Sequence, residues 1–600
     1  MKTVLPQHVY KLPDPLIDLK SVETTEAFNA SSSILYAMAE FGRDERQLAA
    51  DALVFDPAIS KKVIKALVKR QAWKRNDFTE AQPGKFHHEH RQLIVEGKEI
   101  PEKSQEILFT LSKRWGGKKD TFTYYGSYDV TPETLNLIAD VAKQDGTILS
   151  EKVKNEDRGR YISIKESARQ GIQWIQDRVL YGPTTTPQND IVQKFLRKAN
   201  LSRVLPTYHH RVLHPIDMLK NRIVPPLRKS KRVRLLEFQR INQHGITYQG
   251  WMDGGTSLIH STLGLEGILA NHTGPIATIE TQAAAFDAFM NAAYLFPRKE
   301  KHFTRLAEEL RKNVLEYFWM DDLAYFGMGV DRDNKDKLRL IQTLGANGAE
   351  ILNTSFFDNL ANSEKQKYLT GIVKMIFSKE FLTPAGIRTR AKSQAFLSDI
   401  SPQGNQPNSL SDYWDYQGSE TSWIVQTGRI AEGLRRQGFY SLSEQLENRI
   451  LNTVHIFGYN LEYVYVGARG FLENVVAYNI QEKGTPQAVS PQTKIVEIAA
   501  TNIPEFTQTW TASKVAAILH RRMSLAVQPQ TKKGTWQDHL EQETLTQMKN
   551  RNEYVTLLRT TEEILQARNN GYLFLVNKEA GQHAEQEIMA KAKNFYHPHS

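Results

Sequence analysis

The chain has 600 residues, 40% of them apolar and 24% charged, and its 77 Lys and Arg against 67 Asp and Glu give a formal charge of +10. It contains no cysteine, which excludes disulfides, thiolate metal sites and cysteine nucleophiles. Because no apolar run is long enough for a membrane span or a signal peptide, we expect no membrane partner and a cytoplasmic location.

Most of the sequence alternates amphipathic helices with polar loops. Thr131 and Pro132 have the pattern of an N-cap followed by proline at the first helical position, and Gly146 follows the end of that helix. Ser363 with Gln366 predicts a capping box at another helix start. Apolar residues recur at three- and four-residue steps in segments 286–293, 303–318, 369–376 and 442–457.

Strand signals are few, and the best are the short segments 232–236 and 463–466. We therefore predict an all-α fold of antiparallel helix pairs. The chain has no clear fixed-period repeat, which favours a closed helical toroid over an open solenoid. The polar stretches 399–413 and 481–497 are long enough to be functional or disordered loops. From about Lys532 the chain is charged and helical.

Hydrolysis of a glycosidic bond needs two carboxyl groups that flank the bond. Asp253 follows Trp251 in a glycine-rich segment, and burial beside an aromatic ring favours a protonated carboxyl. Glu420, Glu462 and Glu473 have aromatic or apolar neighbours and are candidates for the second carboxyl. An aspartate in such a segment more often only shapes a turn, and each glutamate can equally be a solvated or capping residue.

Two other clusters attract attention. The segment 87–91, His-His-Glu-His-Arg, lacks the His-Glu-x-x-His spacing that aligns two ligands on one helix face, so we predict neither a metal nor a cofactor. Five of the seven residues from Arg228 to Arg234 are cationic, yet such a run is more often a solvated edge or loop. Without interleaved aromatic residues, it does not predict a nucleic-acid partner.

Several stretches, taken together and in order, resemble the bacterial amylo-α-1,6-glucosidases, the glycogen-debranching type of six-hairpin glycosidase. The early ones are Phe41-Gly42-Arg43-Asp44, the nine residues from Pro83 to Arg91, the nine from Tyr124 to Pro132, and Gln249-Gly250-Trp251-Met252-Asp253. The later ones are Pro275-Ile276-Ala277, Glu280, Gln282, Gly386-Ile387-Arg388-Thr389, Trp423 and Gln508-Thr509-Trp510. The resemblance covers roughly residues 35–515.

This resemblance implies an (α/α)6 toroid over residues 31–525, with an N-terminal arm over 1–30 and a C-terminal helical extension over 526–600. It implies a carbohydrate substrate and an inverting hydrolase for an α-glucosidic bond, with α-1,6 as one option. Asp253 is the implied general acid and Glu462 the base, with Glu473 and Glu420 as alternatives. The implied sugar-binding residues are Arg43, Asp44, Glu89, Arg91, Asp129, Trp251, Glu280, Gln282, Arg388 and Trp423.

The sequence also departs from the family pattern. The family's Trp-Pro-His-Asp is Trp423-Ile424-Val425-Gln426 here, and its Leu-Pro-Glu-Leu-Phe has only a loose counterpart at 457–462, with 470–473 as the rival. A toroid that binds glycans without cutting them therefore stays open as the alternative. An inverting site predicts that the Asp253 and Glu462 carboxyl groups lie about 6.5–9.5 Å apart. The sequence does not set the oligomeric state.

Overall fold

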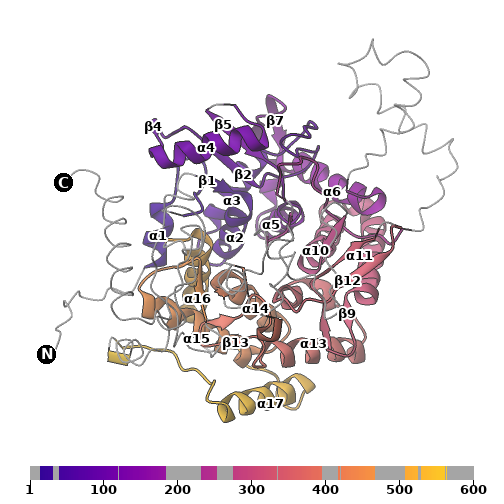
Figure 1. Ribbon diagram of the computed structural model, residues 1–600, viewed down its shortest axis with the longest axis vertical. Helices are drawn as coiled ribbons and strands as arrows, with labels where there is room; N and C mark the ends of the chain where they lie inside the picture. Colours follow the sequence, from indigo (N-terminus) through magenta and orange to yellow (C-terminus); the bar gives the residue numbers. More distant parts are fainter. Residues whose placement is uncertain are drawn as a thin grey trace, which may run out of the picture.

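Helices dominate the protein, which we describe from a computed structural model (Figure 1). The structure describes residues 14–31, 39–118, 120–183, 232–246, 248–252, 275–333, 335–394, 417–418, 421–466, 507–524, 529–560 and 562–563. These residues contain fourteen α-helices, in agreement with the predicted all-α class. None of the helices in the described ranges combines the length and the apolar composition that crossing a bilayer requires.

Six helices form a closed inner ring (Figure 1). Each contacts the next in chain order, and the last contacts the first. They are α2 (Gly42–Ala52), α5 (Val130–Gln144), α10 (Ile279–Leu295), α12 (Asn347–Glu350), α14 (Ile424–Arg436) and α16 (Thr509–Ser524).

An outer helix packs against every member of this ring. Five of them follow their inner helix along the chain, and the sixth, α1, packs on α16 from the other end of the sequence. In ring order they are α3 (Pro57–Lys69), α6 (Ile164–Tyr181), α11 (Glu300–Tyr317), α13 (Asn362–Ile376), α15 (Tyr440–Phe457) and α1 (Pro15–Ser21). The fold is therefore the (α/α)6 toroid that the sequence predicts. Two further helices, α4 (Glu102–Trp115) and α17 (Trp536–Asn550), lie outside this double ring, and α17 contacts α13 and α15.

The predicted helical segments are present, but two helices start elsewhere. The N-cap of α5 is Asp129, whose carboxylate accepts a hydrogen bond from the Val130 amide at 3.0 Å. The Thr131 hydroxyl is engaged instead by the Phe86 amide, also at 3.0 Å, so it cannot cap the helix. Helix α13 begins after Ala361 without a side-chain cap, so the prediction that Ser363 starts it was wrong.

Sixteen short strands accompany the helices within the described ranges, and every pair of them is antiparallel. The two three-stranded sheets have the orders β1-β2-β5 and β12-β11-β8. The strands are β1 (Ala39–Phe41), β2 (Glu89–Gln92), β3 (Ile94–Val95), β4 (Lys98–Glu99), β5 (Thr121–Tyr124), β6 (Lys152–Asn155), β7 (Arg160–Ser163), β8 (Ile276–Thr278), β9 (Trp319–Met320), β10 (Tyr325–Phe326), β11 (Gly329–Arg332), β12 (Leu338–Ile341), β13 (Leu382–Thr383), β14 (Gly386–Ile387), β15 (Thr421–Trp423) and β16 (Tyr463–Tyr465).

The predicted strand at 463–466 is present as β16, whereas the prediction at 232–236 was wrong. The chain there is irregular, and only Phe238 makes a β-bridge, to Ile276. The two cations that produced the alternating pattern form ion pairs, Arg232 with Glu237 at 2.5 Å and Arg234 with Glu309 at 2.6 Å. Residues 228–231 of the basic run lie outside the described residues.

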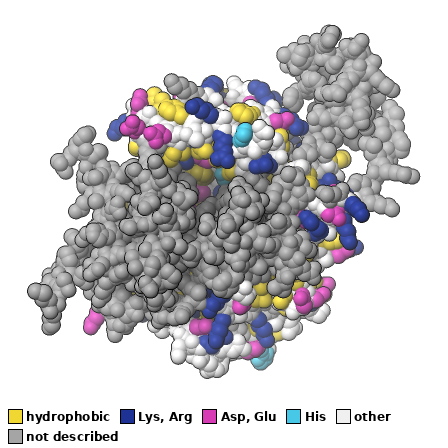
Figure 2. Space-filling model, viewed as in Figure 1, with side chains coloured by type: hydrophobic (Ala, Val, Ile, Leu, Met, Phe, Trp, Pro, Cys, Tyr) yellow, Lys and Arg dark blue, Asp and Glu magenta, His cyan; other side chains and the backbone are white. Residues whose placement is uncertain are grey.

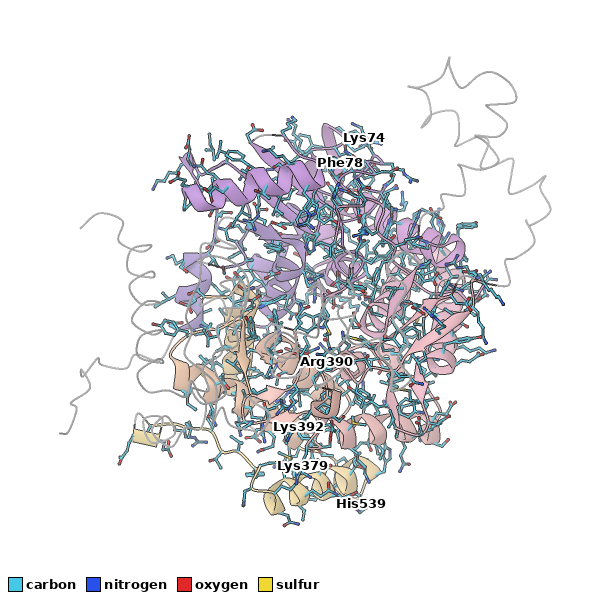
Figure 3. All side chains as sticks on the ribbon, in the orientation of Figure 1. Lys74, Phe78, Lys379, Arg390, Lys392 and His539 are labelled. Atoms are coloured by element: carbon cyan, nitrogen blue, oxygen red, sulfur yellow. The ribbon has the colours of Figure 1, made fainter. Side chains whose placement is uncertain are left out.

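The short strands place the beginnings of the inner helices at one end of the toroid. Strands β1, β8 and β15 run directly into α2, α10 and α14. We call this the funnel end and define it by residues 41–44, 129, 278–280, 347, 422–423 and 507–510. Polar side chains reach deep inside the ring. Arg390, for example, is fully buried and lies toward the middle of the view in Figure 3. Lys74 and His539 are exposed at the edges of the same view.

The visible outer surface carries both signs of charge. On the face shown in Figure 2, Lys and Arg side chains of the described residues are interspersed with Asp and Glu side chains. With Arg232 and Arg234 already paired, the described part of the basic run offers little net charge to a polyanion.

Candidate active site

A small cavity of about 50 Å³ lies at the funnel end. Its walls come from the starts of α2, α14 and α16, and from segments that pack over them. The lining residues are Ala30, Phe41, Arg43, Asp44, His88, Trp251, Gln417, Trp423, Glu462, Gln508 and Trp510. This volume holds a few water molecules, so the side chains around it have to shift before a sugar ring can enter.

Aromatic rings form one wall of the cavity. Trp423 lies edge-on to Trp251 at 5.0 Å between ring centroids, and edge-on to Trp510 at 5.7 Å. Its other neighbour is Tyr463, which is stacked at 5.1 Å because Trp423 and Tyr463 face each other across strands β15 and β16. Flat apolar faces of this kind pack against the C–H faces of sugar rings.

Charged side chains of α2 form another part of the wall. Arg43 donates a hydrogen bond from Nε to Asp129 Oδ2 at 2.6 Å, and from Nη2 to the Gly250 carbonyl at 2.8 Å. Asp44 accepts a hydrogen bond from Gln508 Nε2 at 2.7 Å. Arg43 thus anchors the segment that carries Trp251, while Asp44 presents a carboxylate to the cavity.

Glu462 is the only one of the four predicted catalytic carboxyl groups that the described residues include. It lines the cavity and is 5% exposed. Asp253, Glu420 and Glu473 lie outside the described residues. The separation of the Asp253 and Glu462 carboxyl groups is therefore a prediction still, although Trp251, two residues before Asp253, lines the same cavity as Glu462.

Glu89 and Arg91, expected in the sugar site, lie one layer behind the cavity. They form a buried ion pair on β2, and Glu89 faces Phe41 of β1 across the sheet. The Arg91 guanidinium is 5.9 Å from the centre of the Phe41 ring, and Phe41 lines the cavity. These two residues therefore support the wall. Asp129 also lies outside the cavity lining and supports it, because its carboxylate forms an ion pair with Arg43.

The remaining three predicted residues sit beneath the cavity rather than on its wall. Arg388 is buried beside the α14 start, with its backbone bridged to Ser422 and Nη2 3.4 Å from the Val466 carbonyl. Gln282 hydrogen-bonds both backbone groups of Leu236 at 2.8 Å, so its amide holds the 235–238 segment and is engaged. Glu280 packs against the Gly250 backbone, where a Cβ atom on Gly250 would lie 3.2 Å from Glu280 Oε1.

Several buried polar atoms at the funnel end have no hydrogen-bond partner among the described residues. Leaving such an atom unpaired costs about 1–3 kcal/mol, so several together indicate a place where a polar ligand or ordered water completes the hydrogen bonding. Those at or beside the funnel end without a hydrogen-bond partner among the described residues are His88 Nδ1, Trp251 Nε1, Glu280 Oε2, Asn347 Nδ2 and Oδ1, Ser422 Oγ, Gln426 Oε1, Gln508 Oε1 and Trp510 Nε1.

Sequence reasoning did not assign roles to several of these residues. Gln508 and Trp510 were only landmarks of the resemblance, and Asn347 and Gln417 carry no local motif. His88 lies in the Pro83–Arg91 stretch of the resemblance, and the only role considered for it from sequence is that of a metal ligand. Burial, with the charges of Arg43 and Lys85, holds its pKa well below the usual value, so it lines the cavity as a neutral ring. Within the described ranges, no three potential metal-ligating side chains come together.

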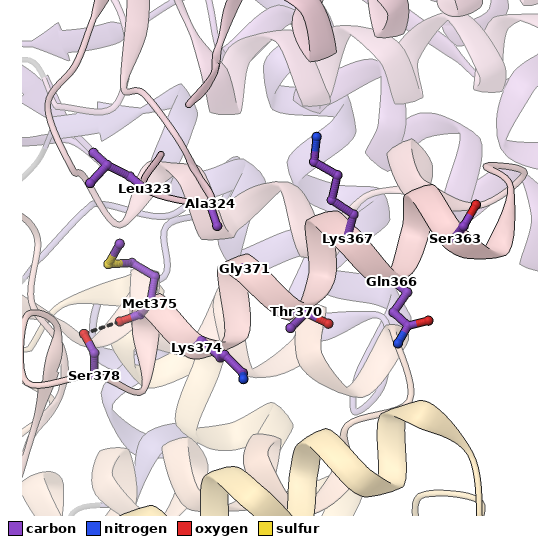
Figure 4. Close-up of a pocket in the computed structure, with 10 residues that line it drawn as sticks. All are labelled: Leu323, Ala324, Ser363, Gln366, Lys367, Thr370, Gly371, Lys374, Met375 and Ser378. Carbon is purple, nitrogen blue, oxygen red and sulfur yellow. Dashed lines mark hydrogen bonds between the residues drawn. The ribbon is translucent and has the colours of Figure 1, made fainter. Parts of the chain in front are cut away.

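A larger cavity of about 600 Å³ lies elsewhere, on the outer face of α13 (Figure 4). Its lining includes Lys367, Lys374 and Met375, but neither a carboxylate nor an aromatic side chain. Both lysines are ion-paired outside it, Lys367 to Asp321 at 2.7 Å and Lys374 to Glu543 of α17 at 3.1 Å. It lacks the groups for glycosidic chemistry, so the smaller cavity is the candidate site.

No protein-family model and no curated protein sequence matches the chain. Among solved structures it is similar to a GH63 mannosylglycerate hydrolase from Thermus thermophilus, with 13% identity and a TM-score of 0.43 over 85% of this chain and 99% of that one. It is also similar to the neutral trehalase of Saccharomyces cerevisiae, with 13% identity and a TM-score of 0.36 over 86% of this chain and 77% of that one. Likenesses at this level carry no argument about activity.

Proposed function

We propose that the protein is a glycoside hydrolase whose site is the cavity at the funnel end. The observation that carries the proposal is the combination, in one cavity, of three tryptophans, the buried Glu462, and polar side chains with unmade hydrogen bonds. Tryptophan faces suit sugar rings, unpaired polar atoms suit sugar hydroxyls, and a buried carboxyl suits acid–base chemistry.

The proposed mechanism uses two carboxyl groups with inversion. Asp253 gives its proton to the leaving oxygen as the glycosidic bond breaks. Glu462 takes a proton from a water molecule, which attacks the anomeric carbon from the opposite face. Glu473 and Glu420 remain the alternatives for the base. An α-glucosidic bond, with α-1,6 as one option, is part of the proposal, as are a cytoplasmic location and the toroid limits at residues 31 and 525.

The proposed sugar contacts come from the family resemblance and from the lining of the cavity. Arg43, Asp44, Trp251 and Trp423 come from the resemblance and line the cavity. His88, Gln417, Gln508 and Trp510 are added because they line it too.

A substitution at Glu462 tests the proposed function. We expect Glu462→Gln to lower hydrolysis of the best substrate, in a panel of α-linked di- and oligosaccharides, by at least about a hundredfold, because general base catalysis supplies factors of this size. Sugar binding, measured by calorimetry, should change by less than about threefold, since Gln keeps the shape of Glu. Glu444→Gln, exposed on α15, is the control and should leave both unchanged. Full activity of the Glu462 variant would rule out this base.

The stereochemistry of the product tests the mechanism separately. Proton NMR of the first released sugar should show the inverted anomer. Release of the retained anomer would contradict the inverting assignment, because a retaining site uses the second carboxyl group as a nucleophile.

A glycan-binding module without hydrolysis is the second candidate. The start of α14 favours it, because the family's His-Asp is replaced by Val425, which is buried, and Gln426, which donates a hydrogen bond to Glu350 at 2.8 Å. Tight sugar binding by a folded wild-type protein that releases no product would favour this candidate over the hydrolase.

A further inference from the structure

The segment that leads into the aromatic wall has no regular structure to hold it. Residues 239–246 and 248–252 form neither helix nor strand, yet Trp251, near their end, is buried and lines the cavity. Buried backbone groups outside helices and sheets need hydrogen-bond partners from elsewhere in the protein. The side chains that supply these partners therefore decide where Trp251 lies.

One of these side chains is Glu80, which is fully buried and lies outside the cavity lining. Its Oε1 accepts hydrogen bonds from the Ile241 and Asn242 amides, both at 3.0 Å, and its Oε2 accepts one from Gln249 Nε2. All three donors are N–H groups, so the carboxylate is used as an acceptor on both oxygens. Gly245 leaves room for this contact, because a Cβ atom there would lie 2.5 Å from Glu80 Oε1.

The backbone of Glu80 is held in a rare conformation. Its φ is 56°, in the left-handed region that residues other than glycine seldom adopt. Such a conformation persists where the surrounding contacts over-determine it, and it is found most often at functional sites. The turn that carries Glu80 is gripped from the other side, since Asn242 Nδ2 donates a hydrogen bond to the Phe78 carbonyl at 2.8 Å.

Gln249 connects this anchor to the cavity. Its side chain donates to Glu80, while its own carbonyl accepts a hydrogen bond from the Tyr128 amide at 2.7 Å. Two residues further on, the Trp251 carbonyl accepts a hydrogen bond from Gln417 Nε2 at 3.1 Å. A shift of Gln249 therefore moves the backbone that carries the Trp251 ring.

We propose that Glu80 is a positioning residue for the site: by holding residues 241–249 through both of its carboxylate oxygens, it sets the place of Trp251 in the cavity wall. Glu80 itself touches no ligand. The part of this inference that concerns sugar rests on the proposed function, whereas the part that concerns the placement of the wall does not.

A second buried glutamate offers a matched control. Glu541 of α17 is 1% exposed, and its Oε1 accepts hydrogen bonds from the Ser441 and Leu442 amides at 2.8 and 3.2 Å. It thus holds the start of α15 as Glu80 holds residues 241 and 242, but it lies outside the cavity lining. Glu80→Ala and Glu541→Ala both leave two backbone amides unpaired, so both should lower the Tm.

The first measurement needs no ligand and follows the oxidation of Met252 by hydrogen peroxide, with mass spectrometry of peptides. Met252 adjoins Trp251 and is 2% exposed, and the rate of methionine oxidation follows exposure. Well below the Tm of every variant, Glu80→Ala should raise the Met252 rate at least about fivefold, because the segment opens locally. Glu541→Ala should leave it within about twofold. Met523, which is 78% exposed, serves as the internal reference.

The second measurement exchanges the two partners of one hydrogen bond. Glu80→Gln turns an amide toward the Gln249 amide, whereas the double variant Glu80→Gln/Gln249→Glu restores a donor and an acceptor with the same total charge. By calorimetry with maltose, isomaltose and trehalose, Glu80→Gln should bind the best of these sugars about tenfold more weakly than wild type, since small displacements of a site are costly. The double variant should recover to within about threefold, and Glu541→Ala should bind like wild type.

Each outcome decides the inference. Equal Met252 oxidation rates in Glu80→Ala and Glu541→Ala overturn it, as does wild-type sugar affinity in Glu80→Gln or an exchange that recovers nothing. If Glu80→Ala does not fold, Met252 oxidation is compared between Glu80→Gln, expected to be fast, and the double variant, expected to be slow; equal rates overturn the inference. If the wild type binds none of the three sugars, the proposed function fails, while Met252 oxidation still decides whether Glu80 places the wall.

Discussion

The two ends of the inner ring treat their buried polar groups differently. At the base of the ring, defined by Asp51, Glu432 and Lys514, the fully buried Lys514 ammonium lies 2.5 Å from Asp51 and 2.8 Å from Glu432. At the funnel end, Trp251 and Asn347 keep polar atoms without partners among the described residues. The ion pairs of Lys514 stabilise the base, whereas the unpaired atoms that border the cavity at the funnel end fit a surface that a ligand completes.

A layer of ion pairs lies between these ends. Glu133 of α5 pairs with Arg46 of α2 and Arg429 of α14, and Arg429 also reaches Glu350 of α12 at 3.0 Å. Four of the six inner helices are therefore tied together one turn below the cavity. This layer explains how the funnel end keeps its shape although its own polar groups are not all satisfied.

The largest expected loss of folding stability is at the base of the ring. Lys514→Met keeps most of the side-chain bulk but leaves the buried Asp51 without its cation and leaves Glu432 with Arg521 alone, at 4.0 Å. We expect a loss of about 3–5 kcal/mol of stability, since removing one partner of a buried ion pair leaves an uncompensated charge. Thermal unfolding measures it, with Lys312→Met, exposed on α11, as the control. A Tm within about 2 °C of wild type would contradict the role assigned to Lys514.

An intermediate effect is expected at Glu447, between α15 and its neighbours. Its carboxylate accepts hydrogen bonds from Arg435, Arg521 and Arg522. Burial raises its pKa, but the three arginines outweigh this and lower it below 4.5. The stability that Glu447 adds is thus present above about pH 4.5 and is lost as the pH falls through the lowered pKa.

Glu447→Gln should therefore cost about 1–3 kcal/mol at pH 7, and the difference from wild type should shrink toward pH 3. Tm series over pH 3–7 measure both, with Glu444→Gln as the control on the same helix. If the Glu447→Gln difference grew on acidification, the paired state of this carboxylate would be disproved.

The smallest effect is expected on the aromatic wall. Trp423→Phe removes part of the face that stacks on Tyr463 and lines the cavity. We expect sugar affinity to fall about 2- to 10-fold, in line with aromatic pair energies of about 0.5–1.5 kcal/mol. Trp536→Phe on α17, whose ring meets Phe439 edge-on far from the cavity, controls for losing an indole and should leave affinity unchanged. Equal losses in both variants would argue against a ligand contact at Trp423.

Helix periodicity predicted the long helices because their buried faces are apolar, as with Phe303, Leu306 and Leu310 of α11. Most of the short strands were not predicted, because their sequences lack the apolar alternation that marks a strand. Strand β2 buries Glu89 and Arg91 by pairing their charges, so it has no apolar alternation. The false strand at 232–236 is the reverse case, in which the alternation came from two arginines that form ion pairs, Arg232 with the nearby Glu237 and Arg234 with Glu309 of α11.

The candidate site was predicted where a motif marks the start of an inner helix. Arg43, Asp44 and Trp423 lie at such starts and line the cavity. Gln282 has a motif position too, but it serves the Leu236 backbone, which only the folded chain reveals. Asn347 could not be predicted from sequence, because its unpaired amide is recognised only from its complete burial.

The closure of the ring has a consequence for how the chain is made. Asp44 of α2 accepts a hydrogen bond from Gln508, which lies 464 residues further along the chain. Helix α1 likewise packs on α16, which begins at Thr509. A growing polypeptide emerging from the ribosome therefore exposes the contact faces of α1 and α2 until nearly all of the toroid has been synthesised. Such long-range contacts form slowly and leave intermediates that expose apolar surface and are prone to aggregate. Chaperone binding during translation should therefore concentrate on nascent chains that still lack α16.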